Sequence, residues 1–140
     1  MTKFKANKRG FIYILILSFL FPILLLYFSA DYSWNNLVLL LPAIIPFAIC
    51  LWVYLDTSYW VDDTNLYYRS GILRGKVAIS TINEVSIGKT LWVGLKPALA
   101  GKGLIIKFNR FDEVYIAPED APTLVETLTT HNPSIKILKY

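Results

Sequence analysis

The fold is decided by two apolar runs that carry no charge, FIYILILSFLFPILLLYFSA at residues 11–30 and LVLLLPAIIPFAICLWVYL at residues 37–55. At about 1.5 Å of rise per residue, each run is long enough as a helix to cross a hydrocarbon core of roughly 30 Å. Only the short polar segment DYSWNN, residues 31–36, separates them. Helices satisfy the backbone hydrogen bonds that lipid cannot supply. We therefore predict a transmembrane helical hairpin over residues 11–55, which returns the chain to the side of its N-terminus.

The basic character of the chain comes from its first ten residues. Mean hydropathy is +0.48 and the pI is about 9.2, but residues 56–140 hold ten Lys and Arg against nine Asp and Glu. Lys and Arg beside a membrane helix mark its cytoplasmic side. We therefore interpret residues 1–10 as a poorly structured basic cytoplasmic tail and place both termini in the cytoplasm. The excess charge then gives no support to nucleic-acid binding. Four cations precede the first run: Lys3, Lys5, Lys8 and Arg9.

A cleaved signal peptide is the alternative interpretation of the first run, because a basic start followed by an apolar stretch is its usual pattern. The run is longer than a usual signal-peptide core, and bulky Phe28 stands where a small residue would be needed. A second apolar run also follows at once. These features favour the hairpin.

After Asp56 the pattern changes to short segments of period-two alternation separated by turn residues, which is typical of antiparallel strands. A last amphipathic helix is expected to begin at Pro118, which suits the first helical position, and to end near His131. Residues 135–138 either add a terminal strand or lie along the barrel that the strands form. The expected strands are residues 58–62, 65–70, 76–80, 82–87, 103–109 and 113–117.

Two segments carry a resemblance to a known family. LYYRSGIL at residues 66–73 leads into VAISTI at residues 77–82, and VYIAPED at residues 114–120 precedes the last helix. Both resemble the bacterial pleckstrin-homology (PH)-like domains that are catalogued as a domain of unknown function and often follow membrane-spanning segments. The resemblance covers about residues 59–137. It implies a membrane-anchored α+β protein in which residues 56–140 form a PH-like antiparallel β-barrel or sandwich with a C-terminal helix.

The chain departs from the family pattern in two places. Ala117 stands where a serine is usual, which removes a side-chain N-cap worth about 1 kcal/mol. The connection LWVGLKPALAGKG, residues 91–103, is more apolar than the polar connection of the family. The resemblance therefore gives no basis for assigning to this chain a function that the connection has in relatives.

The sequence offers no catalytic or metal-binding set. Cys50 and His131 are the single Cys and the single His of the chain, which excludes an intrachain disulfide and a Cys/His zinc cluster. The acidic pairs at residues 62–63 and 112–113 fall at expected turns, where acidic residues are ordinary. We therefore expect no enzyme activity, no metal and no cofactor.

Three cations flank the expected glycine turn at Gly71 and form one candidate interaction surface. Arg69, Arg74 and Lys76 are suited to phosphate headgroups or to an acidic partner. The alternative is an ordinary solvated edge, because cytoplasmic segments beside a membrane are basic in any case. The turn at residues 62–65 (DDTN) is acidic, which argues against a phosphoinositide pocket.

The apolar connection at residues 91–103 is a second candidate surface. It either covers one open end of the barrel or presents an exposed patch to the membrane surface or a partner. We expect Trp92 and Leu95 to be partly exposed.

Taken together, these features predict a membrane-tethered PH-like interaction module on the cytoplasmic face of a bacterial inner (plasma) membrane. Its expected partners are the lipid bilayer and a protein, and neither nucleic acid nor a phosphoinositide is expected. The alternative is a structural or regulatory subunit whose hairpin packs against a larger membrane protein.

Overall fold

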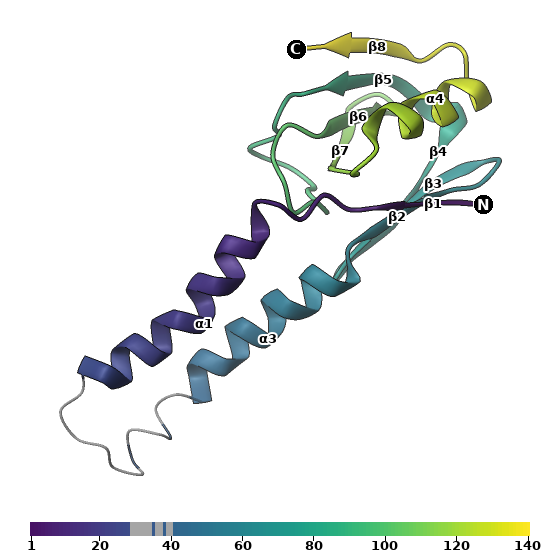
Figure 1. Cartoon of the computed structure of the whole chain (residues 1–140). Coiled ribbons are helices and arrows are strands. Elements are labelled where there is room, and N and C mark those ends of the chain that lie inside the picture. The colour runs from purple at the N-terminus through teal and green to yellow at the C-terminus, as the bar shows by residue number, and fades with distance from the viewer. Residues whose placement is uncertain (29–34, 36–37, 39–40) are drawn as a thin grey trace.

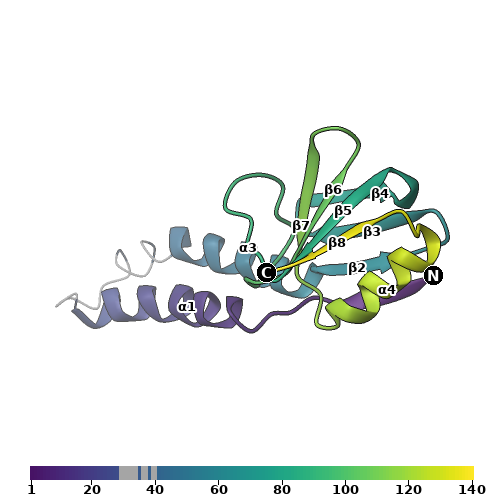
Figure 2. The same cartoon turned by 90° about the horizontal axis from the view of Figure 1, so that it is seen from above.

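The computed structural model describes residues 1–28, 35, 38 and 41–140. Two helices, α1 (Phe11–Phe28) and α3 (Leu41–Asp56), lie side by side and project from one end of a β-rich body (Figures 1 and 2). The ring centroids of Phe19 on α1 and Phe47 on α3 are 5.4 Å apart, so the two helices are in contact. The connection expected at residues 31–36 falls almost entirely outside the described residues.

Helix α1 carries large apolar side chains that stay exposed around its circumference. Among the described helices it is the one that is long and apolar enough to cross a membrane, whereas α3 has 16 residues and is shorter. The structure therefore supports one candidate membrane span, and the pair of spanning helices stays a prediction. Exposed side chains of α1 include Ile12, Ile14, Leu17, Leu20, Phe21 and Leu24.

The first sheet is antiparallel and has the order β1-β2-β3-β4. Its first strand corrects the expectation of a poorly structured tail, because Thr2–Lys5 pairs along its whole length with the strand that follows α3. Phe4 and, beyond the strand, Ala6 are buried in the core, while Lys3 and Lys5 alternate with them on the outside. The strands are β1 (Thr2–Lys5), β2 (Ser58–Val61), β3 (Asn65–Ser70) and β4 (Leu73–Ala78).

The second sheet has the order β7-β6-β5-β8, and its last strand runs parallel to β5. The short 3-10 turn η1 (Ile79–Thr81) separates β4 from β5, so these consecutive strands belong to different sheets. In the described part of the chain the expected antiparallel barrel is therefore not closed, and one strand pair is parallel. The strands are β5 (Ile82–Ile87), β6 (Leu104–Phe108), β7 (Asp112–Ile116) and β8 (Lys136–Lys139).

The C-terminal helix α4 (Ala121–His131) packs Leu124, Val125 and Leu128 into the core that the two sheets share. It begins three residues later than expected, because Pro118 is extended and forms an isolated bridge with Ala6. Asp120 is the N-cap, and its carboxylate accepts a hydrogen bond from the Thr123 amide at 3.1 Å. The Asp120 carboxylate thus supplies the side-chain N-cap that Ala117 cannot provide.

Candidate functional site

Asp56, the last residue of α3, ties the helix to the β3–β4 hairpin. Its carboxylate lies 2.6 Å from Arg69 Nη2, accepts a hydrogen bond from the Gly71 amide at 3.1 Å, and lies 3.9 Å from Arg74 Nη2. Only 12% of the Asp56 side chain is exposed. Two of the three cations predicted to face a ligand are therefore already engaged with a carboxylate.

Two further contacts hold the end of α3 close to the end of β3. The Thr57 hydroxyl donates to the Val53 carbonyl at 2.6 Å and shares a hydrogen bond with the Ser70 hydroxyl at 2.8 Å. Gly71 has a φ of +58°, and a Cβ there would lie 2.7 Å from Val53 Cγ2. The glycine expected at this turn is thus required both for its left-handed backbone and for its approach to α3.

A hollow of about 680 Å³ opens beside this joint, and we call it the junction cleft. Four cations and two carboxylates line it, so it is basic overall. Lys8 Nζ also lies 4.6 Å from the centre of the Tyr54 ring on α3. The lining residues are Lys3, Lys5, Ala6, Lys8, Leu55, Asp56, Thr57, Ser58, Arg69 and Glu119.

The strand register extends the basic surface over the outer face of the first sheet. Residues that face each other across β1, β2, β3 and β4 form two neighbouring rows on this face. The first row consists of Lys5, Ser58, Arg69 and Arg74, and the second consists of Lys3, Trp60, Tyr67 and Lys76. The rings of the two aromatic residues stack with centroids 5.5 Å apart. The structure therefore brings the three predicted cations together on one face.

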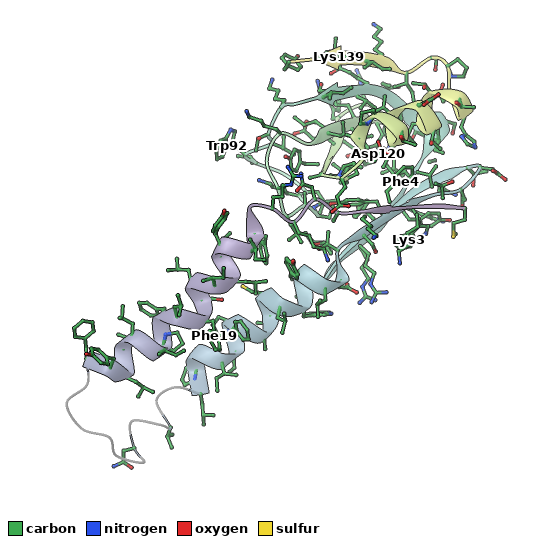
Figure 3. The ribbon with its side chains drawn as sticks, in the orientation of Figure 1. Lys3, Phe4, Phe19, Trp92, Asp120 and Lys139 are labelled. Atoms are coloured by element: carbon green, nitrogen blue, oxygen red, sulfur yellow. The ribbon has the colours of Figure 1, made fainter. Side chains whose placement is uncertain are left out.

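Lys3 and Lys5 belong to this face, which corrects the prediction of a basic tail that only sets the membrane topology. Figure 3 shows Lys3 and Phe4 on opposite sides of β1, as the alternation of exposed and buried residues requires. The signal was present in the alternation of lysines with Phe4 and Ala6, which is the pattern of a half-buried strand.

The acidic turn at residues 62–64 lies at the end of the first sheet that is far from α3 (Figure 1). The Asp62 carboxylate accepts hydrogen bonds from the amides of Thr64 at 2.8 Å and Asn65 at 2.6 Å. These bonds favour the ionised form and lower the pKa of Asp62 to about 2. Asp62 therefore stabilises the turn itself.

The connection between β5 and β6 has two halves with different roles. Trp92 is 88% exposed and Leu95 is 37% exposed, which confirms the expected exposure. Pro97 and Leu99 are buried, and the Pro97 carbonyl accepts a hydrogen bond from the buried Tyr59 hydroxyl at 2.7 Å. Burial raises the pKa of Tyr59 well above its ordinary value. The second half thus covers the core, while the first half leaves an exposed apolar patch.

Trp92 and Leu95 lie apart from the three predicted cations. Leu95 bridges Val114 on β7 of the second sheet, whereas the cations lie on β3 and β4 of the first. Figure 3 shows Trp92 at the margin of the β-rich body. A Cβ on Gly10, the residue before α1, would lie 3.8 Å from the Leu99 carbonyl oxygen. The predicted residues therefore form two surfaces.

Comparison with known families identifies the β-rich body. A model of the family described as bacterial PH domain matches residues 57–132. This is more than half of the chain, which therefore belongs to the bacterial PH domain family, as the resemblance implied. No curated protein and no solved structure matches the chain. PH domains generally act as interaction modules without enzyme activity.

Proposed function

We propose that this protein is a two-pass membrane protein whose PH domain is an interaction module held at the cytoplasmic surface of the membrane. The observation that carries the proposal is the pairing of β1 with β2. The first of these strands precedes α1 and the second follows α3, so the chain must begin and end the helical pair on the same side. If α1 crosses the bilayer, the chain has to cross back before Asp56.

The same pairing weighs against a cleaved signal peptide. Cleavage after α1 would remove β1 together with Phe4 and Ala6, which are 6% and 1% exposed in the core. A segment that completes the domain core is retained more readily than a leader. The orientation follows from charge, because Lys and Arg flanking a membrane helix stay in the cytoplasm.

Cysteine labelling tests this topology in the full chain, with Cys50→Ala as the background. Thr2→Cys and Glu126→Cys probe the two ends of the chain, and Asn35→Cys probes the segment between the helices. All three residues are exposed. In intact cells a membrane-impermeant maleimide should label Asn35→Cys alone, and after lysis it should label all three. Labelling of the two end positions from opposite sides would overturn the proposal.

The exposed patch supports contact of the domain with the membrane surface. Trp92 and Val93 are 88% and 83% exposed, and the second half of the same connection, at Leu99, lies beside Gly10, the residue before α1. Aromatic and apolar side chains in such a place are typical of the interface between lipid and water. A bimane probe at Val93→Cys should therefore be quenched by brominated lipids. The same probe at Ser80→Cys, beyond the far end of β4, should not be quenched.

A further inference from the structure

We propose that the junction cleft binds the phosphate group of an anionic phospholipid. This inference rests on the proposed topology and adds a ligand to it. The proposed ligand is a phospholipid with a single headgroup phosphate, such as phosphatidylglycerol, and not a phosphoinositide, which the acidic turn around Asp62 at the other end of the sheet argues against.

The first argument is the charge that remains after the ion pairs are counted. Asp56 is engaged by Arg69, Arg74 and the Gly71 amide. Within the described part of the chain, Lys3, Lys5 and Lys8 form no ion pair, and Glu119 is the one other carboxylate that lines the cleft. Three ammonium groups around one carboxylate attract an anion.

The second argument is the unused donor capacity of Arg69. Its Nε is buried and its Nη2 pairs with Asp56 at 2.6 Å, but 41% of the side chain is exposed where it lines the cleft. The guanidinium presents its donors in a planar fork that matches the oxygens of a phosphate. A phosphate in the cleft would thus find both point charges and directed donors.

The third argument is position, and it selects a lipid as the source of the phosphate. Leu55, which lines the cleft, is the last apolar residue of α3 and is 67% exposed. Thr57 and Ser58 follow it and line the same hollow. In the proposed topology the chain leaves the hydrocarbon at this point. Acyl chains would therefore lie along the helices while the headgroup phosphate reaches the lysines.

The test uses the full chain in detergent micelles and counts bound lipids by native mass spectrometry. The probes are dioleoyl phosphatidylglycerol and dioleoyl phosphatidylcholine, which share their acyl chains. The wild type should prefer the anionic lipid. The double variant Lys3→Gln/Lys5→Gln should weaken its binding by about tenfold or more, since each lysine near a membrane contributes roughly fivefold.

The matched control is Lys136→Gln/Lys139→Gln, which removes two exposed lysines from β8, the edge strand of the other sheet. It should change binding of the anionic lipid less than about twofold. Lys8→Gln lies beyond β1 and tests the cleft without changing the strand; it should weaken binding by roughly fivefold. Equal losses in the two double variants, or no lipid preference in the wild type, would overturn the inference.

Two further outcomes separate this inference from its alternatives. Displacement of the anionic lipid by millimolar inorganic phosphate alone would assign the cleft to a soluble phosphate and overturn the lipid assignment. Cysteine labelling could support the two-pass topology while Lys3→Gln/Lys5→Gln binds the anionic lipid as tightly as the wild type. That result would overturn the headgroup site and leave the proposed function supported. If the labelling fails, both fall.

Discussion

Two edge strands, β1 and β8, complete the two sheets, and they differ in what they contribute. Both lie outside the matched residues 57–132. β1 is antiparallel to β2 and buries Phe4, whereas β8 is parallel to β5 and all four of its residues are exposed. The first strand is therefore part of the core, and the second mainly covers a sheet edge.

This difference shows that the core of the domain includes residues that precede the first helix. Phe4 and Ala6 pack with residues of both sheets, and the backbone continues the contact beyond β1. The Asn7 amide donates to the Ala117 carbonyl at 2.7 Å, and the Glu119 amide donates to the Lys5 carbonyl at 2.8 Å. The start of the chain is thus held against both the first sheet and the segment before α4.

The largest expected effect is the loss of the β1 anchor in Phe4→Ala. Removing a buried Phe side chain costs both its transfer free energy and the cavity left behind. We expect the free energy of unfolding of the PH domain to fall by about 3 kcal/mol. Urea unfolding of the full chain in detergent micelles, followed by tryptophan fluorescence, measures it. A loss below about 1 kcal/mol would mean that β1 is not part of the core.

The next effect is expected at Gly71, where the sheet that contains β1 meets α3. Gly71→Ala places a side chain at a φ of +58° and against Val53. We expect a loss of about 2 kcal/mol in the same unfolding assay, since the left-handed backbone alone costs about 1 kcal/mol or more. Gly101→Ala is the matched control, because its Cβ would meet only Thr90 Oγ1 at 3.4 Å. Equal losses at both glycines would argue against the close joint.

The sequence predicted most strands of the family region, and most accurately where buried and partly exposed residues alternate, as in β3. The strand expected at residues 76–80 was wrong in its bounds, because β4 spans Leu73–Ala78 and residues 79–81 form a 3-10 turn. β3 and β5 were predicted with their observed bounds, residues 65–70 and 82–87. β1 was missed because its lysines were interpreted through membrane topology alone. The parallel pairing of β8 was not predictable, since alternation gives no strand direction.

The residue types of the candidate site were predictable from the sequence, but the ion pairs that they form were not. The charges of Arg69 and Arg74 were evident, but their engagement by Asp56 depends on how α3 meets the β3–β4 turn. That geometry is set by the Gly71 approach to Val53. The junction cleft could not be predicted for the same reason, because β1, α3 and the segment before α4 come together only in the folded chain.

A smaller effect is expected when the edge strand β8 is changed. Ile137 pairs with Val85 but is 42% exposed, so Ile137→Ala removes far less buried surface than Phe4→Ala. We expect a loss of at most about 1 kcal/mol in the same assay. A loss equal to that of Phe4→Ala would remove the contrast between the two edge strands.

The smallest effect is a pH dependence that belongs to the second sheet. Glu84 on β5 lies 2.9 Å from Lys107 on β6 and is the cross-strand partner of Lys136 on β8. The hydrogen bond from Lys107 lowers the pKa of Glu84. A lowered pKa in the folded state stabilises the fold above the unfolded pKa of about 4.3, and this contribution is lost as the pH falls through the folded pKa.

Glu84→Gln isolates this contribution, because the other carboxylates with lowered pKa values, Asp62 and Asp120, are present in both proteins. Lys107 is 49% exposed, so solvent screens the pair and we expect a difference of only about 0.5 kcal/mol at pH 7. Urea unfolding of wild type and variant should show this difference shrinking toward zero as the pH is lowered below about 4. A difference that grows at acidic pH would contradict the assigned sign, and it would mean that protonated Glu84 fits the second sheet better than the ion pair does.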